Sequence, residues 1–256
     1  MVLSIVTDEL RVAQERAFAL IEEWGLSHVE LRGITGGRIP DGDVDEALRL
    51  VQRHGMGVTS ISPGVFKCRP CQAEIDQHLE RLRRTIALCP RFDCRQIIVF
   101  SIQNVAGDDA PPPLVVEAIR QAGRLAAAAD VRLAIENEPG FHAVTSRSLA
   151  ALIDEVNMPN VGANWDPGNA WPYDQDIDRG PLMLESRLLN VHAKDTAIRA
   201  GERVFDALGK GGVNWRRQIG NLRAMGYGGP VVVETHCEPG VETSRANAEI
   251  LRAWLG

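Results

Sequence analysis

The chain has 256 residues, 45% of them hydrophobic, and a formal net charge of −6. This apolar content can form one large core, and α/β barrels often reach this length as one domain, so we expect a single domain over residues 1–256. The acidic balance argues against a nucleic-acid-binding protein, which normally has a basic face, and favours a small-molecule partner. Residues 1–10 lack the pattern of a signal peptide, and no apolar run reaches the ~20 residues of a membrane span. These features predict a soluble cytoplasmic protein without a membrane partner.

Eight short apolar runs recur along the chain, each typical of a buried parallel strand. In chain order they lie near residues 3–6, 28–32, 57–62, 96–100, 133–136, 161–165, 188–192 and 231–234. Amphipathic segments that predict helices follow them at about 8–25, 43–54, 71–89, 114–129, 146–156, 176–187, 213–225 and 241–254, with the weakest pattern at 176–187. This alternation predicts an α/β fold, a (β/α)8 TIM barrel. An open doubly wound sheet is the alternative, but it would need a glycine-rich phosphate turn after an early strand, and none is present.

The five cysteines form an odd, scattered set, which favours a reducing compartment over a disulfide framework. Cys68 and Cys71, followed by Cys89 and Cys94, loosely imitate a zinc-binding spacing. The predicted helix at 72–88 would hold its two ends about 25 Å apart, so the two pairs cannot bind one metal ion. A metal or redox role for Cys68 and Cys71 remains as an alternative to ordinary loop thiols.

The segments after the predicted strands are long and polar, notably 62–70, 101–113 and 194–212, whereas the segments before the strands are short and contain glycine. Substrate contacts of a TIM barrel lie on the loops at the C-terminal ends of its strands. We therefore expect the substrate at that end, with 194–212 as the best candidate for a lid.

Four potential metal ligands stand singly at the C-terminal ends of four successive strands: Glu136, Asp166, His192 and Glu234. A lone carboxylate there often caps the next helix, and a lone histidine is often a packing residue. Four together at one end of a barrel are better explained by a shared metal site. Three carboxylates and one imidazole suit Mn²⁺, Mg²⁺ or Co²⁺ and tolerate Zn²⁺.

One divalent ion at these residues would polarise neighbouring oxygens of a hydroxy-carbonyl compound and stabilise an enediolate. Glu136 and Glu234 would approach from well-separated strands, so one can remove a proton and the other can return it elsewhere. The sequence therefore predicts isomerisation or epimerisation, with Glu136 and Glu234 as catalytic residues and without an organic cofactor.

Further residues are candidates for substrate binding. Lys194 and Asp195 follow His192 directly and could contact substrate or orient the imidazole. His236 lies two residues after Glu234, on the same side of an extended strand. Lys210 stands in LGKGGVNW, whose backbone amides before a helix could bind a phosphate, although the glycines could equally serve close packing. Arg32, at the end of the second strand, could bind a substrate oxyanion or form an ion pair.

With these residues in view, the chain resembles the sugar phosphate isomerase/epimerase superfamily, the xylose isomerase-like TIM barrels. The resemblance covers nearly the whole chain and rests on SIVTDEL, VELRGI, AIENEPG, NWDPGNA, VHAKD, LGKGGVNW and VVVETH. It implies that Glu136, Asp166, His192 and Glu234 are the family's metal ligands and that Glu136 and Glu234 are its proton-exchanging pair. It also implies a sugar-like substrate and a homo-oligomer.

Two positions depart from one branch of that superfamily. Ketose 3-epimerases usually have a histidine where this chain has Asn169 and a glutamate where it has His142, which makes both residues candidates for binding a different substrate. A metal-dependent dehydratase of the inosose or dehydroshikimate type follows the same enolate logic and is the alternative function. An endonuclease IV-like enzyme would need more histidines and a basic groove, and a non-catalytic sugar-binding barrel would be expected to lack one of the ligands.

Overall fold

The computed structural model describes all residues 1–256, and a closed barrel of eight parallel strands stands at its centre. The strands follow one another round the barrel in chain order, and β1 closes the ring by pairing with β12. They are β1 (Val2–Val6), β2 (His28–Leu31), β5 (Gly57–Val65), β6 (Gln96–Val99), β7 (Arg132–Glu136), β8 (Val161–Trp165), β9 (Leu188–Ala193) and β12 (Pro230–Val233). The predicted (β/α)8 TIM barrel is confirmed.

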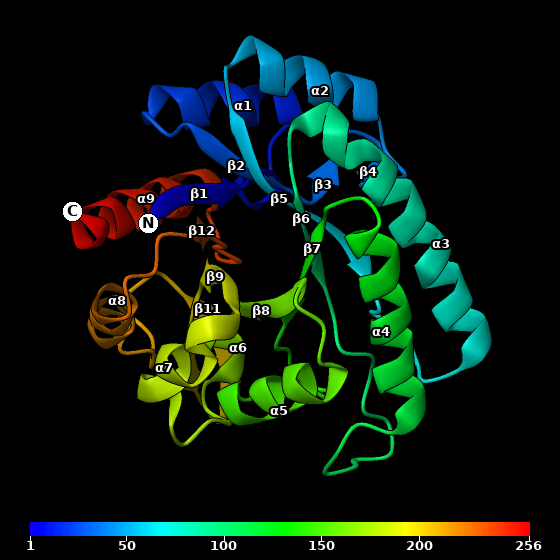
Figure 1. Ribbon diagram of the computed structural model, residues 1–256. Helices are drawn as coiled ribbons and strands as arrows, with labels where there is room; N and C mark the ends of the chain where they lie inside the picture. Colours follow the sequence, from blue (N-terminus) through cyan, green and yellow to red (C-terminus); the bar gives the residue numbers. More distant parts are fainter.

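Helices form a layer outside the strands (Figure 1). After each strand in turn come α1 (Gln14–Glu23), α2 (Val44–Arg53), α3 (Gln72–Leu88), α4 (Pro113–Ala127), α5 (Ser146–Val156), α7 (Gly180–Leu184), α8 (Trp215–Ala224) and α9 (Gly240–Leu255). The short helix α6 (Pro167–Ala170) lies in the loop after β8, and 3-10 turns occur at Thr7–Leu10, Cys89–Phe92, Ile177–Arg179 and Glu185–Arg187. The weakly predicted helix at 176–187 is therefore real but broken into three short pieces.

Side-chain caps begin several of these helices where the sequence changes from polar to amphipathic. The carboxylate of Asp43 accepts a hydrogen bond from the backbone of α2, and Asn214 caps α8 in the same way. Thr145 and Ser148 form a reciprocal capping box at the start of α5. Such caps satisfy amide groups that have no partner within the helix, and so they fix where each helix begins.

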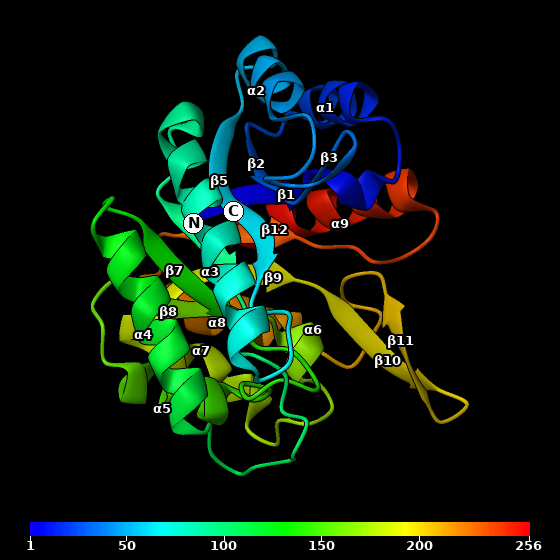
Figure 2. The same cartoon turned by 90° about the vertical axis from the view of Figure 1, so that its right-hand side faces the viewer.

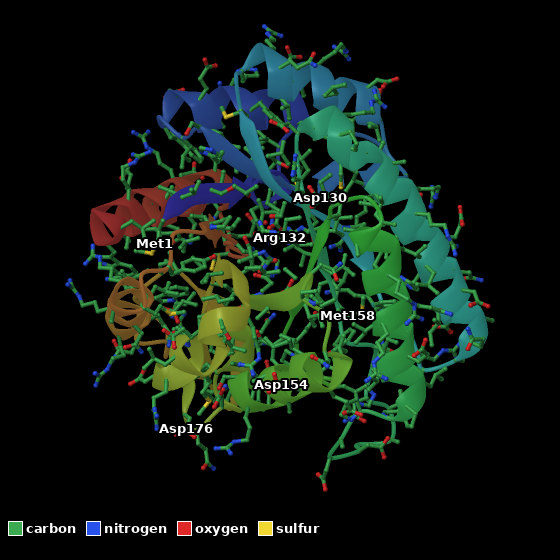
Figure 3. All side chains as sticks on the ribbon, in the orientation of Figure 1. Met1, Asp130, Arg132, Asp154, Met158 and Asp176 are labelled. Carbon is green, nitrogen blue, oxygen red and sulfur yellow. The ribbon has the colours of Figure 1, made fainter.

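Polar side chains run through the barrel interior from Gln96, at the start of β6, to the C-terminal ends of the strands. Figure 3 shows side chains filling the interior and the space between strands and helices. Inside the barrel, Gln96 donates to Asn190 at 3.3 Å, and Asn190 donates to Asn164 at 3.0 Å. Asn164 in turn reaches the side chains of Glu136 and His192. Because every buried amide needs a partner, this ladder links the barrel interior to the polar cluster above it.

Two small hairpins lie outside the barrel. β10 (Asp195–Arg199) pairs with β11 (Glu202–Asp206) in an antiparallel hairpin that projects away from the barrel (Figure 2). The segment predicted as a lid candidate thus has regular structure, with Ile198 and Phe205 exposed on it. The second hairpin pairs β3 (Gly33–Ile34) with β4 (Gly37–Arg38), directly after β2.

The remaining sequence-based expectations about the chain can be compared with the structure. None of the five cysteines forms a disulfide, and the 17-residue helix α3 separates Cys71 from Cys89. No helix combines the length and the apolar character needed to cross a membrane. The two chain termini lie side by side at the N-terminal end of the barrel (Figures 1 and 2).

Two glycines give opposite predictions for the same substitution. A Cβ on Gly162 in β8 would lie 2.3 Å from the carbonyl oxygen of Arg187, whereas a Cβ on Gly220 in α8 would meet nothing within 4 Å. We expect Gly162→Ala to lower the free energy of unfolding by about 1–3 kcal/mol through overpacking. We expect Gly220→Ala to raise it by about 0.5–1 kcal/mol, because alanine is the better helix residue. Urea unfolding followed by circular dichroism measures both, and equal effects would contradict the packing argument.

Candidate metal centre

Glu136, Asp166, His192 and Glu234 converge at the C-terminal end of the barrel. Each side chain contributes one oxygen or nitrogen atom, and these four atoms lie within 4.8 Å of one another. The residues end β7, follow β8, lie in β9 and follow β12, respectively. All four are at least 96% buried. Parallel strands of a closed barrel bring their C-terminal ends to one opening, so four positions far apart in the sequence form one cluster.

Asp166 caps a helix and also contributes an oxygen atom to the cluster, two roles that the sequence left as alternatives. Its Oδ1 accepts a hydrogen bond of 2.9 Å from the backbone of Asn169 and caps α6. Its Oδ2 lies 2.6 Å from the Nζ of Lys194, but not in hydrogen-bond geometry, and has no other partner. Burial raises the pKa of the Asp166 carboxyl to about 6, although Lys194 opposes the shift. A buried oxygen without a hydrogen bond suits a cation.

The two ring nitrogens of His192 face different groups. Nδ1 lies 3.3 Å from Glu234 and 3.5 Å from Glu136, whereas Nε2 lies 3.1 Å from the carboxylate of Glu30. Metal-binding histidines commonly donate their second ring N–H to a carboxylate. Burial lowers the pKa of His192, but Glu30, Glu234 and Glu136 outweigh it and raise that pKa well above its usual value. These carboxylates would equally favour a cation in place of the Nδ1 proton.

Lys194 is the resident positive charge of the cluster. Its Nζ lies 2.6 Å from Asp166 and 2.8 Å from Glu234, and the residue is only 3% exposed. Three carboxylates carry a charge of −3, so the ammonium leaves −2, and the carboxylate of Glu30 beside His192 and the guanidinium of Arg32 beside Glu234 add one charge of each sign. The sum of −2 is the charge that a divalent cation neutralises. An oxygen-rich set with one imidazole is typical of Mn²⁺, Mg²⁺, Co²⁺ or Zn²⁺ sites. The residues therefore fit one divalent metal ion.

Glu136 and Glu234 have unlike surroundings. Glu136 accepts hydrogen bonds from two neutral amides, Asn169 at 3.1 Å and Asn164 at 3.4 Å. Glu234 is held by two cations, Arg32 at 2.7 Å and Lys194 at 2.8 Å. Burial raises the pKa of both carboxyl groups, but neighbouring charges outweigh burial and lower both, in Glu234 well below the usual value. Removing a proton from a substrate is therefore easier for the carboxylate held by amides.

A cavity of about 470 Å³ opens above the cluster. Both glutamates line it, as do four of the residues expected to bind substrate: Arg32, Asn169, Lys194 and His236. Its volume suits a small molecule. Six of the fifteen residues that line this cavity were thus named from the sequence, and their roles belong to the proposed function.

Arg32 and His236 are held by acidic neighbours at the mouth of the barrel. The guanidinium of Arg32 contacts Asp8 at 3.0 Å, Glu234 at 2.7 Å and the carboxylate of Glu9. The Nδ1 of His236 lies 2.8 Å from the same Glu9. Three carboxylates already occupy Arg32, so of the two alternatives in the sequence the structure favours an ion pair that positions Glu234.

Two expected binding residues lie away from the cavity. His142 is buried, but it does not line the cavity and neither of its ring nitrogens has a hydrogen-bond partner. Lys210 is exposed to solvent outside the cavity. The structure thus gives neither residue the substrate contact expected from the sequence.

The glycine-rich loop around Lys210 binds an anion from its own chain. The backbone amides of Gly209 and Gly211 donate to Oδ2 of Asp195 at 2.9 and 3.2 Å, and Val213 donates to Oδ1 at 3.1 Å. A Cβ on Gly211 would lie 2.3 Å from that carboxylate, which explains the glycine. These amides are already satisfied, so of the two alternatives in the sequence the structure favours close packing over a phosphate site. Asp195 orients this loop, not the imidazole of His192.

Several residues at the site were not found from the sequence. Glu30 gave a weak signal, since it stands in an apolar strand two residues before Arg32 and therefore on the same face. Ser62 lies in β5, Phe100 directly follows β6, and Asp8 lies in the 3-10 turn Thr7–Leu10, whereas the others lie on loops and hairpins without any periodic pattern. The cavity-lining residues missed in this way are Asp8, Arg38, Ser62, Lys67, Phe100, Glu138, Pro139, Arg203 and Phe205.

The fold and the site can now be compared with known proteins. The family model of the xylose isomerase-like TIM barrel matches residues 18–254. The chain belongs to this family. The matched range includes all four residues of the buried cluster. The resemblance inferred from the sequence is confirmed. No curated protein sequence matches the chain significantly.

Solved structures with the same fold span several activities. The chain is similar to the probable 3-DHS dehydratase AsbF from Bacillus anthracis, with 20% identity, a TM-score of 0.83, and 98% of this chain and 99% of that chain covered. It is also similar to the IolI protein with a bound zinc atom, with 14% identity, a TM-score of 0.85, and coverage of 100% and 98%. A third is the D-allulose 3-epimerase from Methylomonas sp., with 15% identity, a TM-score of 0.80, and coverage of 99% and 96%. At these identities the likeness establishes the fold alone.

The Asp195 contacts predict a stability effect. Asp195→Ala would leave the amides of Gly209, Gly211 and Val213 without their acceptor, so we expect a loss of about 2–4 kcal/mol in the free energy of unfolding. We also expect faster proteolysis within 207–212. Asp109→Ala, an equal change at an exposed loop position, should alter neither. Urea unfolding and limited proteolysis measure the two effects, and a stable, protease-resistant Asp195→Ala protein would contradict the proposed anchor.

Proposed function

We propose that this protein is a divalent-metal-dependent isomerase or epimerase of a small, sugar-like hydroxy-carbonyl compound. The observation that carries the proposal is the convergence of three carboxylates and one imidazole under a cavity that Glu136 and Glu234 line together. Glu136, Asp166, His192 and Glu234 would hold the ion. When bound, it would supply Lewis-acid stabilisation for negative charge developing on the substrate oxygens.

The residues of the chain provide the means to move a proton. Asn169 holds Oε1 of Glu136 in the cavity, and this oxygen would take the proton next to the substrate carbonyl. Arg32 and Lys194 fix Glu234 on a different strand of the barrel. The ammonium of Lys194, 2.8 Å from this carboxylate, would supply the proton that Glu234 returns to the substrate. Two bases fixed on separate strands can serve two faces or two carbons of the substrate, as isomerisation and epimerisation require.

A dehydratase is the second candidate, favoured by the position of Lys194. Its buried ammonium borders the cavity beside Glu234, where it could hydrogen-bond a hydroxyl group that leaves as water. The similarity to the probable 3-DHS dehydratase supports only the compatibility of this fold with such a reaction. Both candidate reactions begin with removal of the same proton. They differ in whether the substrate then loses a molecule of water.

Metal content and proton exchange test the proposal directly. We expect purified protein to bind about one Mn²⁺, Co²⁺ or Zn²⁺ per chain, and His192→Ala to lose at least tenfold in affinity, because an imidazole ligand is removed. With a panel of ketoses, polyols and 2-keto acids in D2O, we expect deuterium uptake into one substrate class, lowered at least 100-fold in Glu136→Gln.

The panel also separates the two candidates. An isomer that differs from the substrate only by the exchanged deuterium supports the isomerase or epimerase. A product that has lost one molecule of water supports the dehydratase. His54→Ala, a histidine change on the outer helix layer, is the control and should keep the metal. Wild-type protein without metal affinity would refute the proposed function.

Glu30 provides an independent test of the metal centre. Glu30→Gln keeps the size of the side chain but removes the charge that faces Nε2 of His192, so we expect metal affinity to fall about 10- to 100-fold. Glu15→Gln, the same change at an exposed ion pair, should leave affinity unchanged. Calorimetric titration with Zn²⁺ measures both, and equal affinities in the two variants would remove Glu30 from the centre.

A further inference from the structure

The cations that line the cavity are not all neutralised. Of five, Arg32, Lys67 and Lys194 each contact at least one carboxylate. Arg38 and Arg203 line the same cavity, yet no carboxylate oxygen lies within 4.0 Å of either guanidinium. The wall of the cavity therefore offers two guanidinium groups that are not in contact with any carboxylate of the chain.

Arg38 is fixed in place by groups on β5. Its Nε donates to the carbonyl oxygen of Ser62 at 2.8 Å, and its Nη2 donates to the hydroxyl of Ser62 at 3.0 Å. The guanidinium also lies against Gly64, where a Cβ would come within 3.1 Å of Nε. Gly64 has a φ of +75°, so glycine is favoured there on two grounds. These contacts hold the guanidinium while its Nη1 makes no hydrogen bond within the protein.

The surroundings of Arg38 make an anionic partner favourable. Burial, together with the neighbouring guanidinium of Arg32, lowers the pKa of Arg38. Both effects disfavour its charged form, and the carboxylates of Glu136, Asp8 and Glu234 offset them only in part. Arginine nevertheless keeps its proton at any physiological pH. An oxyanion from a ligand would offset the cost of this half-buried charge, and because the guanidinium is already ordered, binding loses little side-chain entropy.

Arg203 is arranged differently. Its Nη2 donates to the carbonyl oxygen of Gly168 at 2.6 Å, and its Nε is buried without a partner. The residue stands on the projecting hairpin β10–β11, beside the exposed ring of Phe205. The Nη1 of Arg203 makes no hydrogen bond within the protein either, so Arg203 also adds positive potential to the cavity. Arg38 is the better-positioned donor because two of its nitrogens are anchored to a barrel strand, whereas Arg203 stands on a projecting hairpin.

We propose that the substrate carries an anionic group, a carboxylate or a phosphate, and that Arg38 binds it through Nη1. This inference rests on the proposed function. The hydroxy-carbonyl group of the substrate would lie at Glu136 and Glu234, and its anionic group would lie at Arg38. The anion site is then on the hairpin β3–β4, not at the glycine-rich loop around Lys210, whose amides bind Asp195.

Matched compounds test this assignment. Dihydroxyacetone, hydroxypyruvate and dihydroxyacetone phosphate share a hydroxy-ketone and differ in charge, as do D-fructose, D-fructuronate and D-fructose 6-phosphate. Calorimetric titration of the full-length, Mn²⁺-loaded protein should show at least one anion binding more tightly than its neutral counterpart. A charged hydrogen bond of this kind corresponds to roughly 10- to 100-fold in affinity. Preference for the carboxylates or for the phosphates identifies the anion.

Variants separate Arg38 from its neighbours. Arg38→Gln should abolish the preference for the anion and leave binding of the neutral compound unchanged. Ser62→Ala keeps the charge but removes one anchor, so it should lower the preference by a few-fold. Arg83→Gln, an equal loss of charge on the outer helix α3, should keep the full preference. Circular dichroism verifies that each variant is folded.

The outcomes are distinct. The proposal is overturned by equal binding of anions and neutral compounds, by the absence of binding of every anion, or by a preference that persists in Arg38→Gln. A preference lost instead in Arg203→Gln or Lys210→Gln would move the anion to the hairpin β10–β11 or to the glycine-rich loop. Metal binding and Glu136-dependent deuterium exchange, in a protein that binds anions and neutral compounds equally, would retain the proposed function without this inference. An anion preference that Arg38→Gln abolishes, in a protein that binds no metal and exchanges no deuterium, would retain this inference without the proposed function.

Discussion

The constraint on which the rest of this structure depends is the concentration of negative charge at the C-terminal end of the barrel. Glu136, Asp166 and Glu234 are buried within a few ångströms of one another, and buried like charges are unfavourable unless cations compensate them. Lys194 and the imidazole of His192 supply part of this compensation. The remaining negative charge is the physical reason to place a divalent ion there.

The barrel holds this charge within a network of buried hydrogen bonds. A ladder of amides from Gln96 through Asn190 to Asn164 supports the cluster from inside the barrel. Asp166 uses one oxygen to start α6 and leaves the other to the cluster. Site and scaffold are thus parts of one hydrogen-bonded network, and substitutions in it are expected to change stability as well as chemistry.

The cavity above the cluster is lined by groups of different character. The two glutamates are the proposed proton-transferring groups, and Arg38, anchored by Ser62, lines the same cavity with a free donor. Binding energy from an anionic group of the substrate at Arg38 could then orient its hydroxy-carbonyl group at the two glutamates. The choice among substrates would then reside in the short hairpin β3–β4, outside the barrel strands.

The sequence by itself determined the alternation of strands and helices, the family, and the four residues that the barrel brings together, because strand ends and hydrophobic periodicity are local signals. It did not determine which polar groups meet across the barrel. Only the tertiary structure placed Glu30 against His192 and joined Asp195 to the amides around Lys210. It also left Arg38 without a carboxylate. These are contacts between segments distant in the sequence, and pairing of buried charge depends on positions in space that no local pattern encodes.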